Sequence, residues 1–185
     1  MLQIVTGTNS GVGLSLTVKL AATHRVFAGI RGVTKTKRAA LDAAASAAGV
    51  SDNVMVTELD VNSDASVKTA VAAAVAAGGG RIDVLVNNAG YSVFGSVEFL
   101  AMETIQSMMN TNFFGAVRCT KAVLPYMRKQ RSGKIVYVSS VGGIWGQPFS
   151  DVYCASKFAL EGMVESQAPI FNSFGVSVTS VQPGG

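Results

Sequence analysis

The chain has 185 residues, of which 49% are hydrophobic and only 14% are charged, so it can form one domain, residues 1–185, with a substantial core. Its net charge of +4 is too small to indicate a nucleic-acid partner. Because no apolar run approaches the roughly 18 residues that span a bilayer and no leader peptide is visible, we expect a cytoplasmic protein without a transmembrane segment, and peripheral attachment to a membrane stays open.

Short apolar runs alternate with alanine-rich helical stretches, which is typical of βαβ units and a parallel sheet. The expected strands are 2–6, 25–30, 54–59, 84–87, 134–139 and 176–181. The expected helices are 12–22, 36–48, 63–77, 102–129 and 151–171. Pro125 and Pro169 fall inside two of these helices, where a proline costs about 3 kcal/mol and kinks the helix. Cys119 and Cys154 lack metal-ligand spacing, which indicates free thiols and no metal site.

The first strand leads directly into a glycine-rich turn, Thr6 to Gly13, and then into a helix. Gly7 allows a tight turn, Gly11 lets the backbone approach phosphates, and Gly13 lets the helix pack on the strand. A pyrophosphate would then meet the free N–H groups of the helix. The motif alone leaves an ordinary βα turn open. With the alternating elements, it predicts an α/β fold of the Rossmann type, a doubly wound parallel sheet in three layers with six strands.

The end of the second strand indicates which dinucleotide fits. Proteins that select NAD carry an acidic residue there, about 20 residues after the glycine turn, but this chain reads Ala28 to Gly32 with Arg31 and no acid. An arginine pairs well with a 2′-phosphate, and Ser10 can add a hydroxyl donor. The sequence therefore favours NADP(H) over NAD(H) as the coenzyme. A solvated basic face is the alternative for the charges near Arg31.

Tyr153 and Lys157 form a Y-x-x-x-K pair on the last expected helix, with Ser140 thirteen residues upstream of the tyrosine. Side chains four residues apart share one helix face. An ammonium beside a phenol favours the phenolate, so a tyrosine so placed can act as a base. The pair alone is also common as a buried ring beside a solvated charge.

Five motifs in this order resemble the short-chain dehydrogenase/reductase family over essentially the whole chain. They are the glycine turn with G-x-x-x-G-x-G spacing, Asn87-Asn88-Ala89-Gly90, Asn112 in Thr111-Asn112-Phe113, the set Ser140, Tyr153 and Lys157, and Pro183-Gly184. The resemblance implies four catalytic residues: Asn112, Ser140, Tyr153 and Lys157. Tyr153 would be the general acid/base, with Lys157 beside it. Ser140 would bond the substrate oxygen, and Asn112 would hold a water that connects Lys157 to solvent.

The same resemblance implies a set of cofactor-binding residues. Asp60 would face the adenine unless it only caps a helix, and Asn88 with Gly90 would brace the sheet beneath the nucleotide. The implied set is Gly7, Asn9, Ser10, Gly11, Val12, Gly13, Arg31, Asp60, Val61, Asn88, Ala89, Gly90, Tyr153, Lys157, Pro183 and Gly184.

Residues 134–178 are most similar to the branch that holds the oestrogenic 17β-hydroxysteroid dehydrogenase and the photoreceptor-type retinol dehydrogenases. That branch works on large hydrophobic alcohols and ketones. Together with the coenzyme preference indicated by Arg31, the resemblance implies an NADP(H)-dependent oxidoreductase that interconverts a lipophilic, steroid- or retinoid-like alcohol and its carbonyl. Val141, Ile144 and Trp145 would line an apolar substrate wall, and Gln147 would add a polar contact.

Family members continue beyond the proline-glycine with a substrate lid and a seventh strand. We therefore expect a C-terminally incomplete chain, for which the alternative function is cofactor binding without turnover. In this family the two long helices commonly form a dimer interface, so the resemblance implies a homodimer for a full-length protein.

Overall fold

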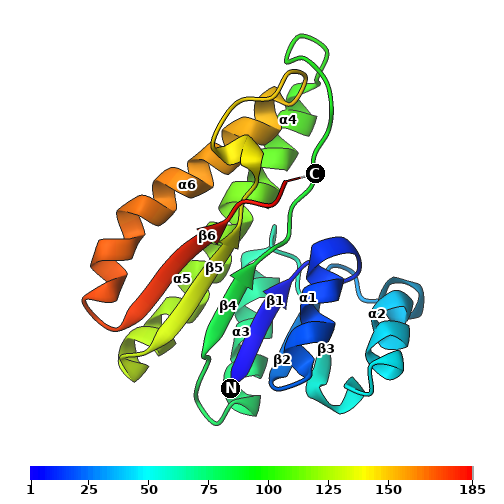
Figure 1. Cartoon of the computed structure of the whole chain (residues 1–185), viewed down its shortest axis with the longest axis vertical. Coiled ribbons are helices and arrows are strands. Elements are labelled where there is room, and N and C mark those ends of the chain that lie inside the picture. Colours follow the sequence, from blue (N-terminus) through cyan, green and yellow to red (C-terminus); the bar gives the residue numbers. More distant parts are fainter. Residues whose placement is uncertain (185) are drawn as a thin grey trace.

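The computed structural model describes residues 1–184, which form one parallel sheet flanked by helices (Figure 1). Its strands are β1 (Leu2–Thr6), β2 (Arg25–Ile30), β3 (Val54–Glu58), β4 (Val84–Asn87), β5 (Gly133–Val138) and β6 (Val176–Val181). They lie in the order β3-β2-β1-β4-β5-β6, and every neighbouring pair is parallel. The expected Rossmann-type α/β fold is confirmed, with each strand starting and ending within one residue of its expected position.

The helices follow the expected order as well. They are α1 (Gly11–Ala21), α2 (Lys35–Ala47), α3 (Asp64–Ala77), α4 (Met102–Met109), α5 (Gly115–Gln130) and α6 (Asp151–Asn172). Two short 3₁₀ turns, η1 (Ser51–Asn53) and η3 (Val141–Gly143), precede β3 and follow β5. No helix within residues 1–184 is both long and apolar enough to cross a membrane.

The strand residues alternate between two helical layers, because successive side chains of a strand point to opposite faces. Ile4, Leu85 and Ile135 are paired across β1, β4 and β5 and pack in one core with α3, α5 and α6. Val5 and Val86, one residue further along, pack on the opposite face with residues of α1. Helices therefore cover both faces, and Figure 1 shows α1 and α2 beside β1 to β3.

The strand order reverses direction between β1 and β4, which lie side by side at the centre of the sheet. In doubly wound sheets, ligands bind at this switch point, beyond the carboxyl ends of the strands. The glycine turn follows β1 and the Asn88-Ala89-Gly90 segment follows β4, so both motifs come to the same edge.

The long helix expected over 102–129 is interrupted. Residues Asn110–Phe114 (η2) form a π-helical turn between α4 and α5, and Asn112 lies within it. Single π turns within helices widen the backbone and are frequent at functional sites.

The two prolines do not end their helices. Pro125 lies inside α5, and α6 continues past Pro169 to Asn172. Pro169 stands in the last turn of α6. Because proline has no backbone N–H, the carbonyl of Glu165 lacks its helical hydrogen bond. Because Glu165 is exposed, water can satisfy that carbonyl.

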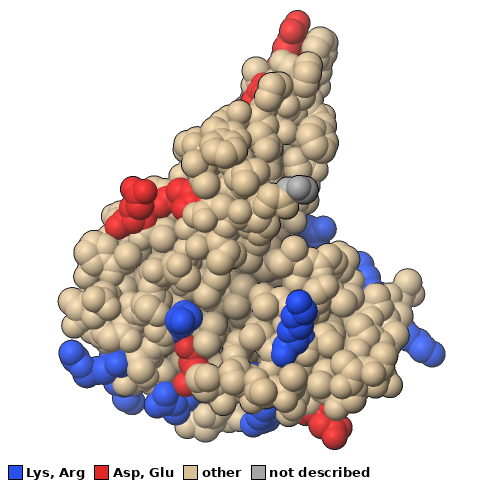
Figure 2. All heavy atoms as spheres, in the orientation of Figure 1, with Lys and Arg blue, Asp and Glu red and all other residues tan. Residues whose placement is uncertain are grey.

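The positive charges are dispersed. Figure 2 shows the lysine and arginine side chains in separate groups over the lower part of one face, without a continuous basic surface there. Both cysteines, Cys119 and Cys154, are buried free thiols, as expected.

Candidate active site

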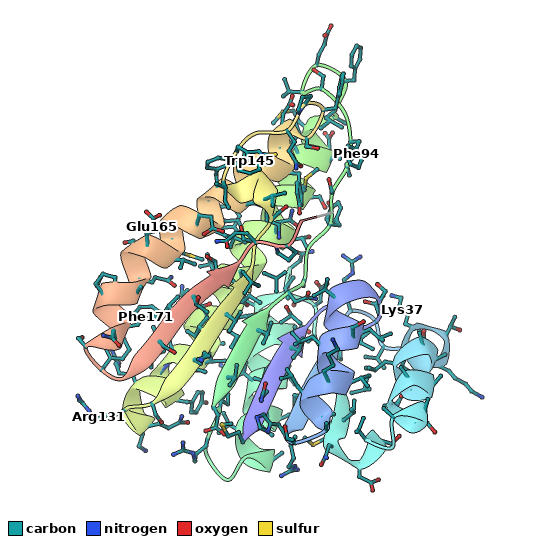
Figure 3. All side chains as sticks on the ribbon, viewed as in Figure 1. Lys37, Phe94, Arg131, Trp145, Glu165 and Phe171 are labelled. Carbon is teal, nitrogen blue, oxygen red and sulfur yellow. The ribbon has the colours of Figure 1, made fainter. Side chains whose placement is uncertain are left out.

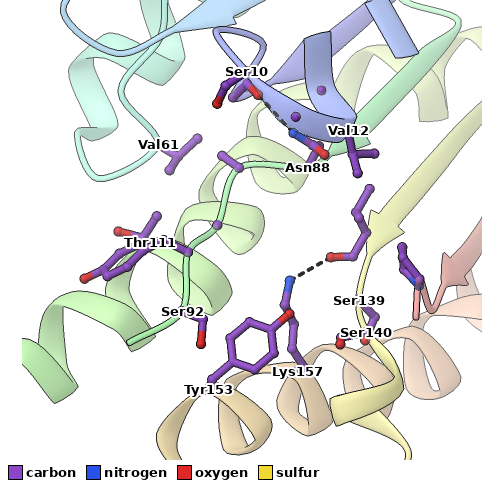
Figure 4. Close-up of a pocket in the computed structure, with 18 of the residues that line it drawn as sticks. Ser10, Val12, Val61, Asn88, Ser92, Thr111, Ser139, Ser140, Tyr153 and Lys157 are labelled. Atoms are coloured by element: carbon purple, nitrogen blue, oxygen red, sulfur yellow. Dashed lines mark hydrogen bonds between the residues drawn. The ribbon is translucent and has the colours of Figure 1, made fainter. Parts of the chain in front are cut away.

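The carboxyl ends of the central strands open into a cavity of about 700 Å³, drawn in Figure 4. All of the expected cofactor-binding residues line it: Gly7, Asn9, Ser10, Gly11, Val12, Gly13, Arg31, Asp60, Val61, Asn88, Ala89, Gly90, Tyr153, Lys157, Pro183 and Gly184. Ser140, Val141 and Gln147 also line it. Its volume lies within the range of small-molecule and cofactor sites.

The glycine turn after β1 forms one wall of the cavity. Gly7 has a φ of +69° and Gly11 a φ of +55°, a backbone conformation that favours glycine. At Gly13 a side chain has no room, because a Cβ would overlap the carbonyl oxygen of Gly7 and lie 2.5 Å from Nδ2 of Asn88. The first turn of α1 carries no acidic residue, and Ser10 makes no side-chain cap, so its N–H groups stay available for an anion.

Asn88 ties this turn to the neighbouring strand. Its Nδ2 donates to the carbonyl oxygens of Thr6, at 2.8 Å, and of Gly7, at 3.1 Å. The backbone N–H groups of Asn88 and Ala89 both donate to Oγ1 of Thr6. These bonds fix the loop after β4 against the glycine turn, which corresponds to the bracing role expected of Asn88.

Arg31 and Asp60 lie on the part of the cavity beside β2 and β3. Arg31 is exposed and stands in the loop between β2 and α2. Oδ1 of Asp60 accepts from the backbone N–H of Asn62 at 2.9 Å, and the N–H of Asp60 donates to Oγ of Ser66 at 2.9 Å. The first bond orients the Asp60 carboxylate, and the second fixes the backbone of Asp60 at the cavity wall.

Lys157 lies at the bottom of the cavity with only 5% of its surface exposed. Its Nζ donates to the carbonyl oxygen of Val138 at 2.8 Å and lies 5.6 Å from the ring centre of Tyr153 (Figure 4). Burial lowers the pKa of the Lys157 ammonium from 10.5 to about 8, while the charge of Glu161 acts in the opposite direction. The ammonium is therefore the main form at neutral pH, one turn from the phenol.

Ser140 follows β5 and begins the η3 turn. Its Oγ accepts from the N–H of Gly142 at 3.1 Å. A hydroxyl that accepts one bond still has its own hydrogen to donate. Ser140 can therefore donate to an oxygen atom placed in the cavity.

Asn112 is the one expected catalytic residue that does not line the cavity. Its Oδ1 accepts from the N–H of Tyr91 at 3.0 Å, and its Nδ2 donates to the carbonyl of Tyr91 and to Oγ of Ser156. Oγ of Ser156 donates in turn to the carbonyl of Tyr153 at 2.7 Å. Asn112 thus connects the loop after β4 to the helix that carries Tyr153, from behind the cavity wall.

Two of the residues expected to form the substrate wall lie outside it. Ile144 and Trp145 are 52% and 61% exposed and do not line the cavity, whereas Val141 does. Val141 begins the η3 turn, Val141–Gly143, whereas Ile144 and Trp145 follow the end of that turn. Figure 3 shows Trp145 and Phe94 at the projection above the sheet.

Several lining residues were not anticipated. They are Leu59, Asn62, Tyr91, Ser92, Phe94, Thr111, Val138, Ser139 and Ser150. Five of them directly adjoin an expected residue, so their position next to a motif could have indicated them: Leu59, Asn62, Tyr91, Thr111 and Ser139. Phe94 and Ser150 stand in loops and carry no such signal. Within residues 1–184, no three acidic, histidine or cysteine side chains gather as a metal site would require.

Comparison with curated proteins gives relatives over nearly the whole chain. It is 44% identical over 185 residues to retinol dehydrogenase 8 of Homo sapiens and 40% identical over 185 residues to 17-beta-hydroxysteroid dehydrogenase type 1 of Homo sapiens. Each match covers 98% of this chain, but 57% and 55% of the respective relative. The chain thus spans little more than half the length of these relatives.

The fold of this chain is also similar to that of solved structures. ElxO with NADP bound is 31% identical, with a TM-score of 0.91 over 99% of this chain and 73% of that one. A short-chain dehydrogenase from Streptomyces avermitilis is 33% identical, with a TM-score of 0.89 over 100% of this chain and 65% of that one. The family model of the short chain dehydrogenases matches residues 2–185. The chain therefore belongs to the short-chain dehydrogenase family, as its ordered motifs predict.

Proposed function

We propose that this chain supplies the coenzyme site and the catalytic groups of an NADP(H)-dependent oxidoreductase that interconverts a lipophilic alcohol and its carbonyl. One observation carries the proposal. Tyr153, Lys157 and Ser140 line the same cavity as the glycine turn and Arg31. A proton-transfer group and a dinucleotide cradle therefore share one site.

The cradle fits a dinucleotide. The first turn of α1 offers free N–H groups to a pyrophosphate, and the absence of side chains at Gly11 and Gly13 lets it approach the backbone. Arg31 would pair with the 2′-phosphate of the adenosine half, and Asp60 and Val61 would contact the adenine. When bound, the nicotinamide donates or accepts the hydride.

The protein groups handle the proton and the oxygen. In reduction, the Tyr153 hydroxyl would protonate the carbonyl oxygen, and in oxidation the phenolate would remove the alcohol proton. The Lys157 ammonium, held by the Val138 carbonyl, would stabilise that phenolate. The Ser140 hydroxyl, oriented by the N–H of Gly142, would donate to the substrate oxygen as negative charge develops on it.

The substrate class is inferred from the relatives and the lining. The two human relatives are named for retinol and for a hydroxysteroid, both large and apolar. Val141 and Phe94 provide apolar lining, and Gln147 and Ser150 provide polar groups. We infer a steroid- or retinoid-like alcohol or ketone as the substrate class.

We also propose a homodimer for the full-length protein, acting in the cytoplasm. Phe114, Phe158 and Ile170 are exposed on or beside α5 and α6, which gives these long helices apolar side chains free for a second copy.

The test is a Tyr153→Phe substitution in the intact protein. Turnover would be measured with NADPH and NADH against retinoid, steroid and short polar carbonyl compounds. Removal of the acid/base group should lower kcat by about 10²- to 10⁴-fold while NADPH binding persists. A variant that keeps more than a tenth of the activity would contradict the assignment of Tyr153. NADPH binding by the wild type without turnover of any compound would support the alternative, a site that binds coenzyme without catalysis.

A further inference from the structure

The loop that carries Arg31 is tied down from two sides. Glu58, the last residue of β3, accepts from the backbone N–H groups of Gly32, at 2.8 Å, and of Val33, at 2.6 Å, with one carboxylate oxygen for each. On the other side, Nζ of Lys37 in α2 donates to the carbonyl oxygen of Arg31 at 2.9 Å. Three hydrogen bonds therefore fix three successive residues, 31–33.

The sheet register brings Glu58 to this loop. Ile30, the last residue of β2, pairs with Glu58 on β3, so the carboxylate lies beside the point where β2 ends. Gly32 has a φ of +61°, and a Cβ there would lie 2.9 Å from Nζ of Lys37. The positive φ therefore favours glycine in this turn, and a side chain there would displace the ammonium group of Lys37.

Both Glu58 oxygens accept from this loop. The two backbone bonds lower the pKa of the carboxyl, and the nearby Lys37 charge adds to this effect. A slight loss of hydration of this exposed side chain opposes it. Glu58 is therefore ionised at neutral pH, yet it does not line the cavity, whereas Arg31 does. This carboxylate is committed to the loop and is not presented to a ribose hydroxyl.

We propose that Glu58 is a positioning residue for coenzyme selectivity: it holds the backbone of residues 31–33 so that the Arg31 guanidinium is presented to the 2′-phosphate. The inference rests on the proposed NADP(H) function. The opposing reading is electrostatic, since a carboxylate near the phosphate would repel it. When the charge of Glu58 is removed, the positioning role predicts weaker binding of the 2′-phosphate, whereas electrostatic repulsion predicts tighter binding.

The experiment uses two adenosine-half probes, so that it does not depend on turnover. Isothermal titration of the chain with adenosine 2′,5′-bisphosphate and with adenosine 5′-monophosphate gives a ratio of affinities that reports the 2′-phosphate contact alone. The variants are Glu58→Gln, Arg31→Ala and the two combined. Glu165→Gln on the exposed surface of α6 is the matched control for loss of one negative charge.

We expect Glu58→Gln to lower the ratio by about 2- to 10-fold, the range for loss of order in one immobilised side chain. In the Arg31→Ala background, the same substitution should leave the ratio unchanged, because the contact that the ratio reports is already lost. Glu165→Gln should leave it unchanged as well. A ratio that stays constant or rises in Glu58→Gln would overturn the positioning role and leave the coenzyme proposal intact. A wild-type ratio near one would overturn both.

Discussion

Lys157 offers a direct test of the buried ammonium beside Tyr153, because its protonation is linked to stability. Its folded-state pKa of about 8 lies below the value of 10.5 for an exposed lysine. Between these pH values the unfolded chain binds a proton that the folded chain does not, so stability rises with pH through this window. Below about pH 8 both states are protonated, and the full difference of 2.5 pKa units costs the fold about 3 kcal/mol.

The perturbation is Lys157→Met, which keeps an unbranched apolar stem and removes the titrating group. Between about pH 7 and pH 9.5, the free energy of unfolding of the wild type should gain about 2 kcal/mol relative to the variant. The variant also leaves the Val138 carbonyl without its donor, at a cost of about 1–3 kcal/mol that does not change with pH. The slope of the difference, and not its value at one pH, therefore reports the buried ammonium.

Urea denaturation of both proteins at a series of pH values, followed by far-UV circular dichroism, gives the required free energies. The buried groups Cys119 and Tyr137, whose pKa values burial raises to about 12, titrate in both proteins and cancel in the difference. A difference that stays constant between neutral and alkaline pH, or that changes in favour of the variant, would refute the reasoning. Lys157 would then be solvated, and its effect on the Tyr153 phenol would be weaker than proposed.

Two further predictions concern packing. Gly13→Ala should place a Cβ against Gly7 and Asn88, lower the free energy of unfolding by about 1–3 kcal/mol and weaken coenzyme binding in a titration. The control Gly162→Ala, which has open space around it on α6, should raise the free energy of unfolding by about 1 kcal/mol. Equal effects of the two substitutions would show that the glycine turn is not tightly packed. A Cys154→Ser variant leaves Cys119 as the thiol to be labelled. At about pH 8, the pKa of about 12 at Cys119 should slow its reaction with an aromatic disulfide about 10³-fold relative to the urea-unfolded chain. Fast labelling of the folded variant would count against the burial of Cys119.

Most of the fold could be predicted because each element carries a local signal. Apolar runs bounded by turn residues define the strands, and the segments after the first two strands contain Gly13 and Arg31, whose residue types indicate a phosphate-binding turn and a phosphate partner. Because parallel strands bring their carboxyl ends to one edge, residues located after different strands could be assigned to one site before the structure was known.

The remaining features depend on contacts between distant segments. The π-helical turn at Asn110–Phe114 coincides with the bonds of Asn112 to Tyr91 and Ser156, and nothing in the helical periodicity of residues 102–129 indicates it. Ile144 and Trp145 are apolar and lie shortly after Ser140, yet the intervening 3₁₀ turn leaves them exposed. In sequence, Glu58 is recognisable only as the end of a strand, because its partners are backbone groups of another loop.

The polar side chains around the cavity fall into two sets. In one set the hydrogen-bonding groups are used within the protein, and in the other set some donors remain free. The side chains of Glu58, Asn88 and Asn112 bond mainly to backbone groups of neighbouring loops, so they hold those loops in position. Ser140 keeps a hydroxyl hydrogen, and Lys157 keeps two of its three N–H donors after bonding to Val138. Since only groups with spare donors can respond to charge that develops on a substrate, substitutions in the first set should act on geometry and coenzyme selectivity. Substitutions of Ser140 and Lys157 should act on the proton-transfer step itself.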